Sequence, residues 1–159
     1  MKKNPLVSVI VNCFNSEKTI LRAINSILNQ TFTNFEIIVW DNDSSDSTRN
    51  LISSLDDNRI KLFKSNKTVP LGIARNFAIN EAKGKYVAFL DSDDLWNPKK
   101  LEKQLSFMCE NDIAFSYTNY QFMSENGANL SNIILAPKKM TYDSDSFLTA
   151  KFLPFKFHN

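Results

Sequence analysis

The chain has 159 residues, of which 43% are hydrophobic and 23% are charged. This is enough chain for one domain with a proper core, and we expect residues 1–159 to form a single domain. The formal net charge of +2 arises from 19 basic and 17 acidic residues without a long run of either sign, which argues against a nucleic-acid-binding protein.

The amino-terminal segment lacks the features of a signal peptide. Its apolar run, residues 6–11, is too short and is followed by no small-residue cleavage site, and no segment predicts a membrane span. Cys13 and Cys109 are too few and too far apart for a disulfide framework or a thiolate metal site. We therefore expect a reduced, cytoplasmic chain, a location that is compatible with peripheral contact at the inner face of the membrane.

Strands and helices are expected to alternate along the chain. Short apolar or β-branched runs indicate strands buried on both faces, and apolar residues at three- and four-residue spacing indicate helices that pack on a sheet. The predicted strands are residues 7–13, 35–40, 60–63, 86–90 and 113–120, with a short strand at 132–135 after a turn at 124–127. The predicted helices run from Asn15 or Ser16 to 30, from Ser44 or Asp46 to 55, from Ile73 to 82, from Pro98 (capped by Asn97) to 110, and over 144–151.

The helical spacing also predicts which side chains face the sheet. For the first helix these are Ile20, Ile24, Ile27 and Leu28, and for the helix after Pro70 they are Ile73, Phe77, Ala78 and Ala82. In the helix that follows Pro98, the spacing assigns Leu101, Leu105 and Met108 to the packed face. Lys99, Lys100 and Lys103 are predicted to form its solvated face.

This alternation predicts an α/β fold with a Rossmann-like, doubly wound and mostly parallel sheet flanked by helices. In the common strand order the first and fourth strands lie side by side. The strand ends at Cys13 and Asp91 would then be adjacent, with Asp41 beside them. Three polar strand ends are therefore expected in one crevice.

Three carboxylates, Asp91, Asp93 and Asp94, directly follow the predicted strand at residues 86–90. Ligands of open α/β sheets bind at the carboxyl edge of the strands, and hard oxygen ligands suit Mg²⁺ or Mn²⁺, which complete their shell with water and phosphate. The sequence therefore indicates a metal–diphosphate site. The same residues also fit a turn followed by helix caps.

The usual phosphate-binding glycine loops do not occur. The chain has three glycines and neither a G-x-G-x-x-G nor a G-x-x-x-x-G-K-[ST] pattern, which argues against a dinucleotide dehydrogenase or a P-loop enzyme. Asp41 is placed to accept a hydrogen bond from a base or ribose, or to cap its own loop. Arg75 is placed to reach a nucleotide or to form an ion pair with one of the acids.

Five motifs together resemble the amino-terminal, donor-binding portion of family 2 glycosyltransferases, in the family's order and spacing across about residues 5–110. They are residues 5–11 with Phe14, Asn15 and Glu17; residues 26–31 with 35–39; residues 41–48; residues 72–76; and residues 84–94.

The resemblance implies a GT-A fold and the inverting transfer of a sugar from a nucleotide-diphospho-sugar, such as a UDP-sugar. It implies that Asp91 and Asp93 hold Mn²⁺ or Mg²⁺ and that Asp41 contacts the base. The nucleotide-binding residues that it implies are Asn12, Phe14, Asn15, Glu17, Asp41, Arg75, Asp91 and Ser92. The implied acceptor is a glycan or a lipid-linked sugar in polysaccharide assembly for a bacterial cell envelope.

The chain departs from the family pattern at three positions. The family usually has proline where Asn12 stands, a second aspartate where Asn42 stands, and glycine where Asp43 stands. Asn42 adds no charge, so the predicted base contact depends on Asp41. Asn12 lacks the fixed φ of proline, which affects the local geometry of the loop.

The general base that inversion requires is not evident in the sequence. Asp143 and Asp145 fit a helix start better than catalysis, and His158 lies next to the last residue. We therefore expect the chain to lack an acceptor-binding portion. The apolar residues 147–148 and 152–155 are expected to pack against that portion or against a second copy in a homodimer.

Two other classes of function are compatible with the sequence. One is a non-catalytic or truncated module that binds a nucleotide-sugar, and the missing base favours it. The other is a nucleotidyltransferase, which normally has a glycine-rich loop with a basic residue after its first strand. The residues that stand there, Asn12 to Asn15, argue against it.

Overall fold

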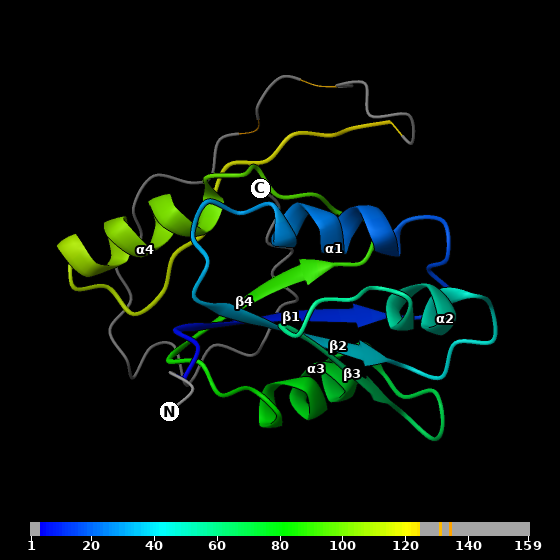
Figure 1. Ribbon diagram of the computed structural model, residues 1–159. Coiled ribbons are helices and arrows are strands. Elements are labelled where there is room, and N and C mark those ends of the chain that lie inside the picture. Colours follow the sequence, from blue (N-terminus) through cyan, green and yellow to red (C-terminus); the bar gives the residue numbers. More distant parts are fainter. Residues whose placement is uncertain (1–3, 125–130, 132–133, 135–159) are drawn as a thin grey trace.

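The computed structural model describes residues 4–124, 131 and 134 (Figure 1). Strands and helices alternate as predicted. The elements are β1 (Val7–Cys13), α1 (Ile20–Leu28), β2 (Phe35–Asp41), α2 (Thr48–Ser53), β3 (Ile60–Lys64), α3 (Leu71–Asn80), β4 (Tyr86–Asp91) and α4 (Lys100–Glu110). In the described part of the chain, none of these helices has the length and apolar character to cross a membrane.

The four strands form one parallel sheet in the order β3-β2-β1-β4. The prediction that the first and fourth strands are neighbours is confirmed. Helices α1 and α2 lie on one face of the sheet and α3 lies on the other (Figure 1). This is the doubly wound architecture, in which parallel strands are covered on both faces by their crossover helices.

The larger core lies between the sheet and α1. All of β1 is buried, and α1 contributes four fully buried side chains, which include the predicted Ile20, Ile24 and Ile27. On this face α4 adds Leu101 and Leu105. The smaller core lies under α3 and is built around Ile10, Ile38 and Ala78.

The inner face of α3 differs from the prediction. Its buried residues are Ala74 and Ala78, whereas Ile73 and Phe77 are 45% and 41% exposed. Small alanine side chains let the helix lie close to the sheet, which leaves the larger neighbours on its flanks. Phe77 packs there against Trp40, with 5.3 Å between ring centroids.

The prediction that residues 86–90 are buried on both faces is also wrong. Among the described strands, β4 lies at the edge of the sheet, and Val87 is 41% exposed. An apolar run indicates a strand, but it does not tell whether another strand pairs with its outer side.

Two helices begin later than predicted. Helix α1 starts after Thr19, and α4 starts after Lys99 rather than at Pro98. The predicted cap residues form loop contacts instead: the carbonyl of Ser16 accepts the N–H groups of Thr19 and Ile20, and Asn97 Oδ1 accepts the N–H of Lys99.

Lys100 does not belong to the solvated face on which it was predicted. Its side chain is buried, with Nζ 4.1 Å from the centroid of the Trp96 ring, and it donates a hydrogen bond to Gln104. Burial lowers the pKa of Lys100 to about 8. A lysine ammonium is attracted to the face of an aromatic ring, and the attraction is stronger where water is excluded. Helical spacing alone does not predict this contact.

The predicted strand at residues 113–120 does not form in the structure. Within the described residues, this segment makes one isolated antiparallel bridge, between Tyr120 and Ile134. A run of β-branched and aromatic residues favours a strand only where a partner strand is available. The predictions for residues 124–127, 132–135 and 144–151, and for Asp143, Asp145, His158 and the apolar residues 147–155, lie wholly or largely outside the described residues.

A buried carboxylate holds the amino-terminal edge of the sheet together. Glu36 on β2 accepts hydrogen bonds from the Ser8 hydroxyl at 2.6 Å, from the Lys83 N–H at 2.7 Å and from the Lys61 ammonium. The Gly84 N–H donates to the same Ser8 hydroxyl. The turn before β4 is thereby fixed to both central strands.

Gly84 has no room for a side chain. An added Cβ would lie 2.5 Å from the backbone nitrogen of Ser8, so we expect Gly84→Ala to destabilise the protein by about 1–3 kcal/mol through overpacking. Gly72, whose added Cβ would meet nothing within 4 Å, is the matched control. Its change to alanine in α3 is expected to stabilise by up to about 1 kcal/mol. Urea denaturation measures both changes, and equal effects would contradict the packing argument.

Glu36 should make stability depend on pH. Burial opposes its charge, but the hydrogen bonds from Lys61, Ser8 and Lys83 outweigh burial and hold the pKa of Glu36 below 4.5. The stabilisation is therefore present above pH 4.5 and is lost as the pH falls through the lower pKa of the folded state. We expect Glu36→Gln to cost about 1–3 kcal/mol at pH 7 and less at pH 3, as measured by urea denaturation at each pH. A difference that is constant with pH would refute this role.

Candidate functional site

The carboxyl ends of three strands meet at one edge of the sheet, as the sequence predicts. Asn12 of β1 pairs in register with Asp91 of β4, and Cys13 pairs with Asp41 of β2. This is the edge at which open α/β sheets bind ligands.

The side chains at these strand ends divide between the two faces of the sheet. Cys13 belongs to the α1-side core, and Asp41 bonds Arg49 of α2. Asp91 points the other way, because its Oδ1 accepts a hydrogen bond of 2.7 Å from Arg75 of α3. The alternation of side chains along a strand therefore separates the predicted single crevice into an α2 side and an α3 side.

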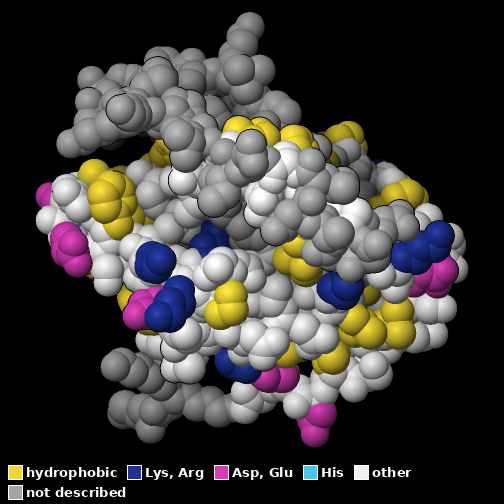
Figure 2. All heavy atoms as spheres, turned by 90° about the horizontal axis from the view of Figure 1, so that it is seen from above, with side chains coloured by type: hydrophobic (Ala, Val, Ile, Leu, Met, Phe, Trp, Pro, Cys, Tyr) yellow, Lys and Arg dark blue, Asp and Glu magenta, His cyan; other side chains and the backbone are white. Residues whose placement is uncertain are grey.

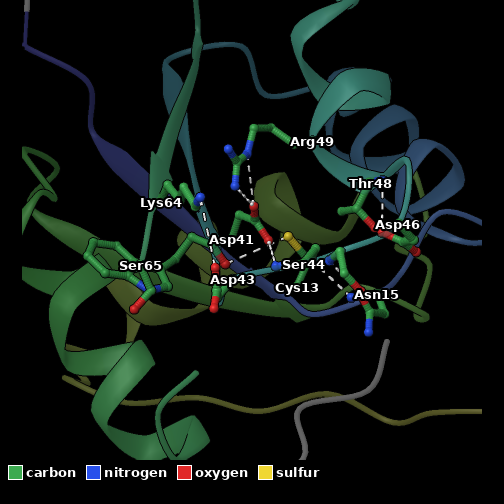
Figure 3. Close-up of polar contacts among 12 residues, drawn as sticks. Cys13, Asn15, Asp41, Asp43, Ser44, Asp46, Thr48, Arg49, Lys64 and Ser65 are labelled. Carbon is green, nitrogen blue, oxygen red and sulfur yellow. Dashed lines mark hydrogen bonds and ion pairs between the residues drawn. The ribbon is translucent and has the colours of Figure 1, made fainter. Parts of the chain in front are cut away.

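Asp41 is fully buried, and both of its carboxylate oxygens are engaged (Figure 3). Its Oδ1 accepts the Ser44 N–H at 2.9 Å, and its Oδ2 accepts Arg49 Nε and Nη2 at 3.1 and 2.9 Å. The predicted base contact of Asp41 stays a prediction. In the structure this carboxylate caps its own loop, which is the alternative that the sequence left open.

The pairing of Arg49 with Asp41 was not predicted from the sequence. Arg49 lies in the first turn of α2, eight residues after Asp41, and only the closed loop brings the two together. A basic residue at the start of a short helix after an acid-ended strand is a weak signal for such a pair.

The thiol of Cys13 is unreactive. Burial first, and then the charges of Asp41 and Asp46, raise the pKa of its thiol to about 12. The thiol therefore stays protonated near neutral pH and provides neither a nucleophile nor a thiolate ligand.

Side chains fasten the loop after β1 to the loop after β2 (Figure 3). The N–H of Asn15 donates to Ser44 Oγ, and Asn15 Oδ1 accepts the N–H of Ser45, both at 2.9 Å. Glu17 bonds the loop after β2 both as a donor and as an acceptor. Its N–H donates to Asp46, and its carboxylate accepts the N–H of Ser47. Asn15 and Glu17 thus hold the two loops together, and their contact with a nucleotide stays a prediction.

The backbone of these loops explains one departure from the family pattern. Asp43 has φ of 70° and Asn15 has φ of 48°. Both lie in the left-handed region, where glycine is favoured and where aspartate and asparagine are the best tolerated alternatives. Asp43 can therefore occupy the position at which the family usually has glycine.

Asn42 also has a structural role. Its Nδ2 donates to the Val69 carbonyl at 2.8 Å, and its Oδ1 accepts the Val69 N–H at 3.1 Å. This two-way pairing joins the end of β2 to the segment that leads into α3.

An open hollow of about 710 Å³ lies between the loops. Phe14, which is 50% exposed, lies in its wall, and Ser92 is joined to Ser16 by a hydrogen bond of 2.9 Å. The lining residues are Phe14 to Thr19, Ser45, Asp46, Ser92 and Asp93. Five of the predicted site residues, Phe14, Asn15, Glu17, Ser92 and Asp93, therefore share one hollow, whereas Asn12, Asp41, Arg75 and Asp91 are not among its lining residues.

Charge does not gather on the face that Figure 2 shows. Its Lys and Arg side chains are interspersed with Asp and Glu, and hydrophobic side chains lie between them. The described residues that are visible on this face form no basic stripe of the kind that binds nucleic acid.

Among the described residues, no three His, Cys, Asp or Glu side chains are close enough to hold one metal ion. Asp91 and Asp93 are the predicted pair, and Arg75 already bonds one oxygen of Asp91. Two carboxylates suit a hard cation that draws its other ligands from water and phosphate.

Comparison with known proteins decides the family. The model of glycosyl transferase family 2 matches residues 8–155. The chain belongs to this family.

Two curated relatives are similar over most of the chain. The Escherichia coli protein named UDP-Glc:alpha-D-GlcNAc-diphosphoundecaprenol beta-1,3-glucosyltransferase WfgD is 44% identical over 138 residues, which are 87% of this chain and 54% of WfgD. The putative teichuronic acid biosynthesis glycosyltransferase TuaG of Bacillus subtilis is 43% identical over 141 residues, which are 87% of this chain and 56% of TuaG. The chain thus spans about half the length of these family 2 relatives.

Solved structures support the GT-A-like fold. The crystal structure of S. aureus TarS 1-349 in complex with UDP-GlcNAc matches with a TM-score of 0.63 and 34% identity. The match covers 67% of this chain and 32% of the TarS chain. The predicted α/β fold and the predicted family are therefore confirmed.

The Asp41–Arg49 pair should matter more than a surface ion pair. Arg49→Gln leaves a fully buried carboxylate without its cation, and we expect a loss of about 3 kcal/mol in the free energy of unfolding. Lys64→Gln is the control, because both side chains of the Lys64–Asp43 pair are exposed and Nζ and Oδ1 are 3.9 Å apart, so its loss should cost below about 1 kcal/mol. Adding Asp41→Asn to Arg49→Gln should recover part of the loss in urea denaturation. If the two single variants lost equally, the burial argument would fail.

Proposed function

We propose that the chain provides the donor-binding part of an inverting glycosyltransferase that uses a nucleotide-diphospho-sugar, specifically a UDP-sugar. The observation that supports this most is the parallel strand edge at which Asp91, bonded to Arg75, is followed by Ser92 and Asp93 in the wall of the hollow. Such an edge provides both a guanidinium for phosphate and oxygen ligands for a cation.

The donor set fits Mn²⁺ or Mg²⁺. Asp91 and Asp93 would hold the ion, with Arg75 sharing Asp91, and the remaining ligands would be water and diphosphate oxygens. When bound, the ion neutralises charge on the diphosphate leaving group.

The side chains of the chain itself bind and orient the donor in this proposal. Arg75 holds the Asp91 carboxylate in place at 2.7 Å and adds positive charge beside the diphosphate. Phe14, half exposed in the wall of the hollow, offers an apolar face to the nucleoside. Displacement with inversion also needs a general base for the acceptor hydroxyl, and we assign none to the described residues.

The proposed acceptor is a lipid-linked sugar or a glycan. WfgD is named for transfer to a diphosphoundecaprenol-linked sugar, and TuaG for teichuronic acid biosynthesis. This similarity supports the proposal that the chain acts in the assembly of a cell-envelope polysaccharide. We propose that it does so at the inner face of the membrane.

A second candidate is a module that binds the donor without turnover. The observation that favours it is the lack of an assigned base among the described residues. Donor binding without release of UDP in the presence of acceptor would distinguish it from an enzyme.

Metal-dependent donor binding tests the proposal. We expect UDP to bind in calorimetry with Mn²⁺ and at least about tenfold more weakly without it, since the ion links Asp91 and Asp93 to the diphosphate. Asp91→Asn with Asp93→Asn should abolish the effect of Mn²⁺. Asp56→Asn, which changes an exposed carboxylate without a described partner, should not. If neither the removal of Mn²⁺ nor the double substitution changed the affinity for UDP, the proposed metal role of Asp91 and Asp93 would be refuted.

A further inference from the structure

The segment that joins β4 to α4 carries Ser92 and Asp93 into the wall of the hollow. We call residues 92–99 the β4–α4 loop. It runs back along α1, from the end of β4 to the start of α4 (Figure 1). The loop contains neither a helix nor a strand. The position of Asp93 therefore depends on the bonds that this loop makes to other parts of the chain.

Helix α1 and the residues that flank it hold this loop. Before the helix, Ser16 Oγ and Ser92 Oγ lie 2.9 Å apart. Within the helix, Ser26 Oγ accepts the N–H of Trp96 at 3.1 Å. Trp96 is 4% exposed and belongs to the core on this face of the sheet. The loop is thus fastened to α1 near both ends of the helix.

Gln30, two residues past the end of α1, makes the connection at the far end of the loop. It is 4% exposed. Its Nε2 donates to the Asn97 carbonyl at 2.7 Å and to the Ser26 carbonyl at 3.1 Å. Its Oε1 accepts the N–H of Leu101 at 3.0 Å. One buried amide therefore joins α1, the β4–α4 loop and α4.

The bond to Leu101 replaces a local helix cap. The first N–H groups of a helix need partners from outside the helix, and the N-cap residue of α4, Lys99, makes no side-chain hydrogen bond of that kind. Gln30 provides one such partner from 71 residues earlier in the chain. Without the amide, the Leu101 N–H would stay buried and unpaired, and the Asn97 carbonyl would lose its bond to α1.

The motif at residues 26–31 is thereby connected to the site, although none of its residues lines the hollow. We infer that Gln30 is a positioning residue that holds the β4–α4 loop so that Asp93 can share a divalent cation with Asp91. This rests on the proposed function, because the cation and the diphosphate belong to it. Gln30 touches neither of them and acts through the loop, as the residues that orient metal ligands commonly do.

Gln30→Met tests the inference. Methionine has nearly the length and volume of glutamine, so the space stays filled while the bonds to the loop are lost. In calorimetry, we expect Mn²⁺ to strengthen UDP binding at least about tenfold in the parent chain and below about threefold in the variant. The affinity for UDP without Mn²⁺ should stay the same. A purely structural role would lower the melting temperature and leave the effect of Mn²⁺ unchanged, with both chains measured well below their melting temperatures.

Hydrogen exchange of the ligand-free chain provides a readout that needs no metal. In Gln30→Met, the amides of Trp96 and Leu101 should exchange about tenfold faster or more, because the loop opens locally. The amides of β1, which lie in the centre of the sheet, should exchange at the parent rate.

Gln104→Met is the matched control. Gln104 lies in α4 and bonds the side chains of Lys100 and Ser116, so the same substitution removes buried or partly buried amide bonds that do not reach the loop. The exchange of the Trp96 amide and the effect of Mn²⁺ should both be unaltered.

The outcomes separate this inference from the proposed function. If the parent chain binds no UDP, or binds it equally with and without Mn²⁺, the proposed metal role fails and the role of Gln30 fails with it. If the parent chain shows the effect of Mn²⁺ and a folded Gln30→Met variant shows it equally, only the role of Gln30 is overturned. If Gln30→Met does not fold, Gln30→Asn decides, because it keeps an amide but withdraws it from the loop by one methylene. An unchanged effect of Mn²⁺ in that variant overturns the role of Gln30.

Discussion

The position of β1 between two parallel neighbours in matching register is the constraint on which the site depends. Parallel strands end at the same edge, so the last residues of β1, β2 and β4 are forced to adjoin. Asn12 is level with Asp91, and Cys13 is level with Asp41. At that edge the main-chain ladder ends and polar side chains replace apolar ones. A shift of one residue would turn every one of these side chains to the opposite face.

The loops at this edge are held by each other more than by helix caps. Neither α1 nor α2 has a side-chain hydrogen bond at its N-cap. Asn15 and Ser44, residue types that favour caps, bond from one loop to the other. Asp46 accepts the N–H of Glu17 from the other loop and the N–H of Thr48, the first residue of α2. Cap-forming side chains take whichever backbone N–H the tertiary structure presents. The result is a rigid wall for the hollow that contains Ser92 and Asp93.

Two aspartate–arginine pairs occupy the two faces of the same sheet edge and differ in their surroundings. The Asp41–Arg49 pair is closed, because Asp41 is fully buried and its oxygens are all engaged. The Asp91–Arg75 pair is partly exposed and uses one oxygen of the carboxylate. A buried ion pair whose carboxylate oxygens are all bonded stabilises the fold. In a partly exposed pair, the arginine or the carboxylate can instead bind a ligand. The partly exposed pair, Asp91 with Arg75, is the one to which our proposal assigns a part in donor binding.

The sequence by itself determined the doubly wound α/β fold, the neighbouring first and fourth strands, the family, and the cluster of polar strand ends. These follow from local patterns: runs of apolar residues, helical spacing, and motifs in a fixed order. Only the tertiary structure decided that Asp41 is sealed by Arg49, that Lys100 packs on Trp96, and that residues 113–120 form no strand. Each of these depends on which distant residues exclude water or provide a partner. The spacing of residues along the sequence does not predict those contacts.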